Sequence, residues 1–230
     1  MERQQNIGLA TLLLSFIAGY CDIVTFASAD NIFSAHVTGN FIVFVCQVLN
    51  GSDGNNWIKL LTFPVFIISV VIGGWITFYS TNRFLLLLIE GIILVASGLI
   101  PWLFRISNVS SSEWITYMTA MFIVFAIGLQ NAFGKLYADE TYAPTTMMTG
   151  NVTLLSLNIG ALIRDRFDDA ISLLSFKKLL VAIGGFLAGC FLGGLMSIQF
   201  GLSAVIFPGL AMIICYIKKS GQITNPAITV

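Results

Sequence analysis

Two copies of a Thr-Gly-Asn triplet are the polar groups best placed to do chemistry. Residues 38–40 carry the first triplet, in SAHVTGNFIVF, and residues 149–151 carry the second, in TTMMTGNVTLL. Both stand at the entrance of an apolar run, where their donors and acceptors must be paired away from water. A helix beginning at either threonine would direct backbone N–H groups and a positive dipole end inward, which suits an anion or a carboxylate. Alternatively, the triplets only cap helices and pack them together.

Asp22 is the sharpest single candidate, because it lies about fourteen residues into the first apolar run. A charge at the centre of a bilayer costs roughly 2.5–3.5 kcal/mol, so it normally faces the protein interior. The matching position later in the chain is the amide Asn131, which follows Gln130. An acid at one position and an amide at the matching position predict a single titratable group, suited to proton or cation coupling. The alternative is an Asp that only hydrogen-bonds between helices.

His36 and Glu90 are the other titratable candidates. His36 is the only histidine and precedes Thr38 by two residues. In a helix it would share a face with Asn40, and it could bind a proton near neutral pH; the alternative is a hydrogen-bonded histidine at the membrane interface. Glu90, in LLLLIEGIILV, either faces a central cavity or lies near enough to the surface to be hydrated.

The candidate solute-binding residues are polar or turn-forming residues at matched places along the chain. They are Asp22, His36, Thr38, Gly39, Asn40, Gln130, Asn131, Thr146, Thr149, Gly150 and Asn151.

Motifs for catalysis, cofactors and metals are absent from the sequence. It contains no G-x-S-x-G, H-E-x-x-H, Walker A or G-x-G-x-x-G pattern. The four cysteines are scattered singly through apolar runs, without the spacing of a zinc site or a disulfide framework. We therefore expect no enzyme activity, no cofactor and no metal site.

The composition indicates a membrane protein. Hydrophobic residues make up 57% of the 230 residues and charged residues only 10%, against about 25% charged in an average soluble domain. A soluble core of this size could not hide so much apolar surface. The net charge of zero gives no basic surface for nucleic acid. The first apolar run, which resembles a signal peptide, is expected to be retained because a matching segment recurs mid-chain.

Eight apolar segments can be delimited against the roughly 20 residues that cross a bilayer. They cover residues 8–29, 35–50, 57–79, 84–104, 114–134, 145–163, 178–198 and 200–217. The charged stretch 164–178 connects the sixth to the seventh, and a polar tail follows from residue 218. The sequence thus predicts an all-α polytopic protein with one membrane domain over 1–230.

The order of features predicts an internal repeat. Residues 19–22 (GYCD) match 128–131 (GLQN), the triplets match each other, and Gly73-Gly74 matches Gly193-Gly194. The offset grows from 109 to 111 to 120 residues, as insertions in loops would produce. We expect one half over about 8–104 and the other over about 114–217.

The number of membrane crossings stays open between six and eight. Either count places nine of the eleven Lys and Arg on the side of both termini. The positive-inside rule therefore predicts cytoplasmic termini but does not distinguish six crossings from eight. The triplet segments are short in uninterrupted apolar length, which favours re-entrant or half-length helices and six full crossings. Six crossings make the halves inverted repeats, and eight make them parallel repeats.

The same residues resemble the YoaK-like family of integral membrane proteins, a domain of unknown function. The resemblance rests on Gly-x-x-Asp at 19–22, Thr-Gly-Asn at 38–40, Gly-x-Gln-Asn at 128–131 and Thr-Thr-x-x-Thr-Gly at 145–150. It covers nearly the whole chain and implies a bacterial inner-membrane protein of about six spans. It implies no substrate.

We expect a small-solute transporter or channel-like protein whose polar site is formed by the two triplet segments and Asp22. The alternative is a non-transporting membrane protein, lipid-binding or scaffolding, in which the triplets only pack helices. Expected partners are a small solute and the lipid bilayer, with no nucleic acid, and a homo-oligomer is compatible with the sequence.

Overall fold

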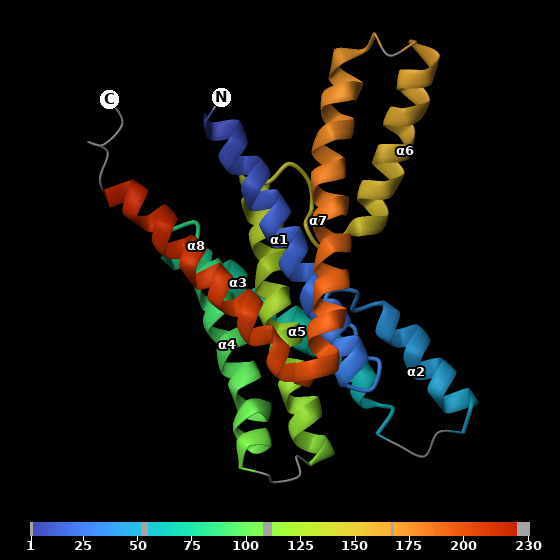
Figure 1. Ribbon diagram of the computed structural model, residues 1–230, viewed down its shortest axis with the longest axis vertical. Coiled ribbons are helices and arrows are strands. Elements are labelled where there is room, and N and C mark those ends of the chain that lie inside the picture. Colours follow the sequence, from blue (N-terminus) through green and yellow to red (C-terminus); the bar gives the residue numbers. More distant parts are fainter. Residues whose placement is uncertain (1, 52–54, 108–111, 167, 225–230) are drawn as a thin grey trace.

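The protein is described by a computed structural model that covers residues 2–51, 55–107, 112–166 and 168–224. These residues form eight α-helices and two short 3-10 helices, with no strand among them (Figure 1). The helices are α1 Glu2–Ser28, α2 Gly39–Leu49, α3 Ile58–Tyr79, α4 Leu85–Ile106, α5 Glu113–Leu136, η1 Ala138–Glu140, α6 Met148–Arg164, α7 Ala170–Phe200, η2 Gly201–Val205 and α8 Ile206–Thr224. The all-helical prediction is confirmed.

The boundaries of the last two helices differ from the sequence prediction. The charged stretch 164–178 is mostly not a connection, because α7 already begins at Ala170. The side chain of Asp169 accepts the backbone N–H of Ile171 and so caps that helix. At the other end, α8 continues to Thr224, so the expected polar tail is partly helical; its residues 225–230 lie outside the described part of the chain.

Five helical stretches in the described residues are long and apolar enough to cross a membrane. They are Gln4–Ser28, Ile58–Tyr79, Leu85–Ile106, Glu113–Leu136 and Ala170–Ile217. The last stretch, of 48 residues, contains α7, η2 and the first part of α8, and the chain reverses direction at η2 (Figure 1). Gly201 makes the break with φ 57°, a value that glycine adopts without steric cost.

The two triplet helices are shorter than these stretches. Helix α2 has 11 residues and α6 has 17. At 1.5 Å per residue, α2 is about 16 Å long, roughly half the thickness of the hydrocarbon layer. In Figure 1, α6 lies near the end of the molecule that holds both chain termini, and α2 lies near the opposite end.

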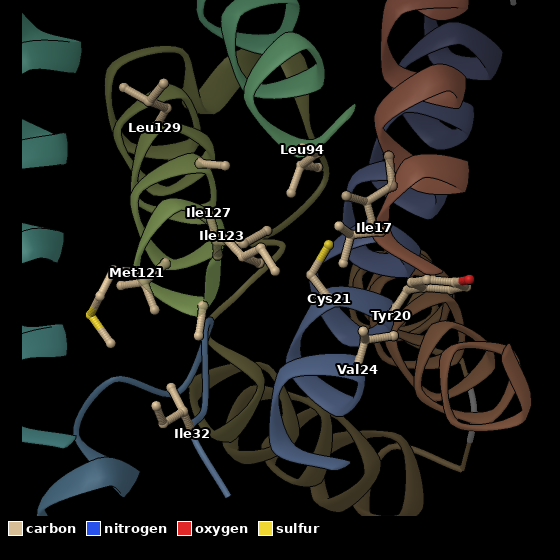
Figure 2. Close-up of a cluster of buried hydrophobic side chains, with 14 of the residues drawn as sticks. Ile17, Tyr20, Cys21, Val24, Ile32, Leu94, Met121, Ile123, Ile127 and Leu129 are labelled. Atoms are coloured by element: carbon tan, nitrogen blue, oxygen red, sulfur yellow. The ribbon is translucent and has the colours of Figure 1, made fainter. Parts of the chain in front are cut away.

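The core combines apolar packing with polar groups placed inside. Ile17 and Cys21 of α1 lie toward Leu94 of α4 and Ile123 of α5, and all four are fully buried (Figure 2). Buried polar side chains and exposed large apolar ones occur together in the described residues. This distribution is the reverse of a water-soluble surface and fits a lipid environment.

Helices α1 and α7 cross at glycine. A Cβ on Gly189 would lie 2.0 Å from the carbonyl oxygen of Phe16, and one on Gly19 would lie 2.2 Å from that of Phe186. Small residues let two backbones approach this closely, which is how helices associate where lipid removes the hydrophobic driving force.

The remaining long helices also pack in pairs. Helix α3 packs along α5 and α4 along α8, while α2 contacts α3 and α6 contacts α7.

Candidate solute-binding site

The loop before α2 is held to α1 by Asp22. Its Oδ1 accepts the backbone N–H groups of Ala35 at 2.7 Å and His36 at 3.3 Å, and its Oδ2 lies 2.6 Å from Nδ1 of His36. Asp22 is only 4% exposed, so this set of partners satisfies a carboxylate that burial would otherwise destabilise.

His36 lies in that loop, outside the apolar helices. The hydrogen bond that the ring donates to the Asp22 carboxylate raises the pKa of the imidazole above its ordinary value, while partial burial acts in the opposite direction. The ring makes edge contacts with the rings of Phe33 and Phe186. His36 is therefore oriented by Asp22 on one side and by aromatic rings on the other.

The loop before α6 is held to α5 by neutral side chains. Oδ1 of Asn131 accepts the hydroxyl of Thr146 at 2.7 Å. Nε2 of Gln130 donates to the hydroxyl of Thr145 at 2.9 Å and to the carbonyl of Leu14 at 2.8 Å. Asn131 thus tethers its loop as Asp22 does, but without a charge.

The asparagine of each triplet turns back onto its own loop. Nδ2 of Asn40 donates to the carbonyl of Phe33 at 2.9 Å and to the hydroxyl of Thr62 at 3.0 Å, and Oδ1 accepts the Phe33 N–H at 2.8 Å. Nδ2 of Asn151 donates to the carbonyl of Pro144 at 2.7 Å. Each asparagine therefore reaches back seven residues and fixes the turn that leads into its helix.

The two triplet segments meet at one pocket of about 420 Å³. Thr38 lines it from the first segment, and Thr149 and Gly150 line it from the second. The rest of the lining comes from Ala35, His36, Val37, Phe66, Val70, Asn131, Lys135, Thr146, Met147 and Met148. A second pocket shares His36 and Thr38 with it and continues toward α1 and α7.

The predicted site residues therefore divide into three groups. Six line the shared pocket: His36, Thr38, Asn131, Thr146, Thr149 and Gly150. Asp22 and Gly39 line the second pocket. The last three are buried and hydrogen-bonded to the loops before α2 and α6, so they hold those loops in place without lining a pocket: Gln130, Asn40 and Asn151.

Lys135 is a pocket residue that the sequence analysis missed. It lies four residues after Asn131 on α5 and is exposed where it lines the pocket. The spacing of four residues places Lys135 and Asn131 on one helix face, and this spacing could have indicated Lys135 from the sequence.

A second missed group joins the loop before α2 to α3. Lys59 is fully buried and forms an ion pair with Asp30, and its ammonium lies 5.9 Å from the centre of the Tyr117 ring. The same Asp30 accepts a hydrogen bond from Gln47 of α2 at 3.1 Å. A lysine at the start of a long apolar run is visible in the sequence, but its partner is 29 residues away and no local pattern indicates it.

Glu90 is fully buried in α4, so the expectation that it could be hydrated near the surface is wrong. Neither of its carboxyl oxygens hydrogen-bonds to any described residue.

The apolar helical stretches, with polar groups gathered inside, define an α-helical protein compatible with several passes through a membrane. The chain belongs to the family described as "Protein of unknown function (DUF1275)", whose model matches residues 10–217. This membership confirms the resemblance found in the sequence. No curated protein and no solved structure matches the chain.

Proposed function

We propose that the protein moves a small polar solute across a membrane, and that the solute binds in the pocket where the two triplet segments meet. Thr38 and Thr149 are 111 residues apart in the chain and line the same pocket. This convergence is the observation on which the proposal rests, since polar groups on short helices at membrane depth are tolerated where they line a cavity.

The architecture that fits this proposal has six crossings in two inverted halves. The first long helix of each half packs on the third of the other, α1 on α7 and α5 on α3, and the fourth helices pack on each other. The short helices α2 and α6 lie near opposite ends of the molecule. Inverted repeats with broken or half-length helices at a central site are a common plan among transporters. In this arrangement both termini face the cytoplasm from a bacterial inner membrane.

The lining favours a neutral or anionic solute. Threonine hydroxyls, the Asn131 amide and the Lys135 ammonium reach the pocket, with Phe66 and Val70 supplying apolar contact. No carboxylate is among these lining residues, and Asp22 in the adjoining pocket is already bonded to His36. In this proposal Asp22 positions His36 at the junction of the two pockets. The proton or cation coupling expected of Asp22 would then act through the Asp22–His36 pair.

The alternative, a membrane protein whose triplets only stabilise helix packing, is favoured by one observation. The buried asparagines of both triplets bond to their own loops, which requires no solute. This alternative leaves the exposed threonines Thr38 and Thr149 without a role.

A binding screen separates the two proposals. The purified protein is heated with a panel of amino acids, sugars, carboxylates and polyols, because a solute that binds the folded state raises the melting temperature by mass action. A stabilising solute is then tested for uptake into proteoliposomes by the wild type, Thr149→Val and the control Thr153→Val, which lies one turn further along α6.

The proposal expects Thr149→Val to raise the dissociation constant of the solute about tenfold, the value of one hydrogen bond to a polar solute, and so to lower both its uptake and its shift of the melting temperature. Thr153→Val is expected to leave both unchanged. Equal uptake by all three proteins would remove the pocket from the mechanism.

A further inference from the structure

The carboxyl group of Glu90 lies in the apolar interior without a described partner. Its side chain is 0% exposed and both oxygens are unbonded. Leu94, one turn further along α4, points toward Ile17 and Cys21 of α1 (Figure 2). Buried polar groups in proteins are nearly always hydrogen-bonded, so an unpaired carboxyl in such surroundings requires an explanation.

An ionised carboxylate at this position would be much less stable than the neutral acid. Transfer of an isolated charge out of water costs so much that a buried group takes up a proton instead. An ionised Glu90 would need a cation or several N–H donors, as Asp22 has in Ala35 and His36. In the described residues Glu90 has neither.

The titratable groups around Glu90 do not supply that compensation. Cys21 of α1 lies within electrostatic range of both Glu90 and Asp22, and a thiol offers no positive charge. On the helices that pack against α4, the titratable side chains that the structure describes have other partners or are at least partly exposed. Lys59 and Tyr117 interact with Asp30, and Tyr216 bonds to Asn82. The exposed or partly exposed ones are Glu113, Lys135, Tyr79 and Cys215. The segment η2 contributes none.

A pocket lined by residues of α1, α4, α5 and α8 lies one helical turn from Glu90 along α4. It holds about 210 Å³ between α1, α4, α5 and α8, and along α1 it extends from Asn6 to Leu14, about 12 Å at 1.5 Å per residue. Leu87 and Met212 line its wall; Leu87 precedes Glu90 by three residues, and Met212 would touch a Cβ on the neighbouring Gly91 at 3.1 Å. The carbonyl of Leu14, where the pocket ends on α1, accepts from Gln130, whose own Oε1 is buried and unpaired.

We propose that Glu90 is a proton-binding site, protonated in this conformation and supplied with protons through the pocket between α1, α4 and α8. The site is separate from the triplet pocket and does not depend on a solute.

Infrared spectroscopy tests the protonation directly, because the C=O stretch of a neutral carboxyl is separate from the bands of a carboxylate. The wild type minus Glu90→Gln difference spectrum, recorded at about pH 7.5, is expected to contain a neutral-carboxyl band. The matched control, Glu113→Gln on the exposed start of α5, is expected to remove only carboxylate bands. A Glu90→Gln difference spectrum that contains only carboxylate bands would overturn the proposal.

Stability against pH gives an independent measurement. The folded protein keeps a proton on Glu90 that the unfolded chain releases as pH rises above the ordinary range of glutamate, so wild-type stability falls with pH through this group. Glu90→Gln, which cannot ionise, is expected to match the wild type at about pH 4.5 and to melt at least roughly 2 °C higher at about pH 8. If Glu90→Gln were less stable than the wild type at about pH 8 but not at about pH 4.5, Glu90 would be ionised in the folded protein, which would contradict the proposal.

The supply route is tested by filling the pocket. After transfer to D₂O the neutral-carboxyl band shifts as its proton exchanges. Ala10→Phe, which places a ring among the pocket residues, is expected to slow this shift at least about tenfold, a barrier change of roughly one RT ln 10. Ala188→Phe on the exposed face of α7 serves as the control, and an unchanged rate in Ala10→Phe with a normal melting curve would overturn the route. None of these readouts involves solute, so failure here is distinguishable from failure of the transport proposal.

Discussion

Asp22 and His36 are fourteen residues apart in the chain, and Oδ2 of the aspartate lies 2.6 Å from Nδ1 of the histidine. Together with the bond from the N–H of Ala35, this pair holds the loop before α2 against α1. The loop before α6 is held by a bond without charge, which joins Asn131 to Thr146. The first loop is therefore held by two titratable side chains, and the second by neutral ones.

Removing the Asp22 carboxylate is expected to destabilise the protein strongly. Asp22→Ala leaves two backbone N–H groups without their acceptor and should lower the free energy of unfolding by about 3–5 kcal/mol. Asp22→Asn keeps an oxygen that can accept the Ala35 N–H and should cost about 1–2 kcal/mol. Unfolding in mixed detergent micelles measures both. Asp139→Ala, on an exposed ion pair with Arg83, should change stability by less than about 1 kcal/mol; equal losses at Asp22 and Asp139 would contradict this account.

Stability is expected to depend on pH through His36. Because Asp22 raises the pKa of His36 above its ordinary value of about 6.5, the folded state binds the proton more tightly than the unfolded chain does. The stabilisation is fully present below that ordinary value and is lost as pH rises through the higher folded value. The melting-temperature difference between the wild type and His36→Gln, followed from about pH 5 to about pH 9, should shrink with rising pH. A difference that grows instead would mean that neutral His36 is the bonded form.

The two triplet asparagines are expected to differ in their contribution to stability. Asn40 makes three hydrogen bonds and is fully buried, so Asn40→Ala should cost about 3 kcal/mol. Asn151 donates to one backbone carbonyl, and Asn151→Ala should cost about 1 kcal/mol. The comparison is made by unfolding in mixed micelles, with Ser156→Ala on the exposed face of α6 as control. A larger loss at Asn151 than at Asn40 would contradict the assigned bonds.

The crossing of α1 and α7 is expected to tolerate no side chain at Gly189. A Cβ there would lie 2.0 Å from the Phe16 carbonyl oxygen, so Gly189→Ala must separate the backbones and should cost about 3 kcal/mol. Gly184, five residues earlier on α7, has nothing within 4 Å of its Cβ position. Gly184→Ala should be neutral or stabilise by up to about 1 kcal/mol through helix propensity. Melting temperatures of the two variants test the packing; similar values would show that the helices do not cross at Gly189.

Much of the secondary structure follows from local sequence. The eight apolar segments are helices because a backbone in an apolar environment must satisfy its own hydrogen bonds, and a helix does this within one segment. The start of α7 was missed because the residues after Asp169 mix Ser172, Ser175 and two lysines with apolar ones. The cap at Asp169 was the readable signal, since Asp is favoured at a helix N-terminus.

The sequence by itself determined the apolar helices, their membrane-like composition and the matched polar positions, including Asp22, Asn131 and both triplets. Only the tertiary structure decided what those residues contact. It directs Asn40 and Asn151 back onto their loops, brings Thr38 and Thr149 to one pocket, pairs Lys59 with Asp30 and leaves Glu90 unbonded. Helix periodicity is a property of neighbours within a few residues, whereas these contacts join segments far apart in the chain and depend on how closely glycines such as Gly189 let whole helices approach.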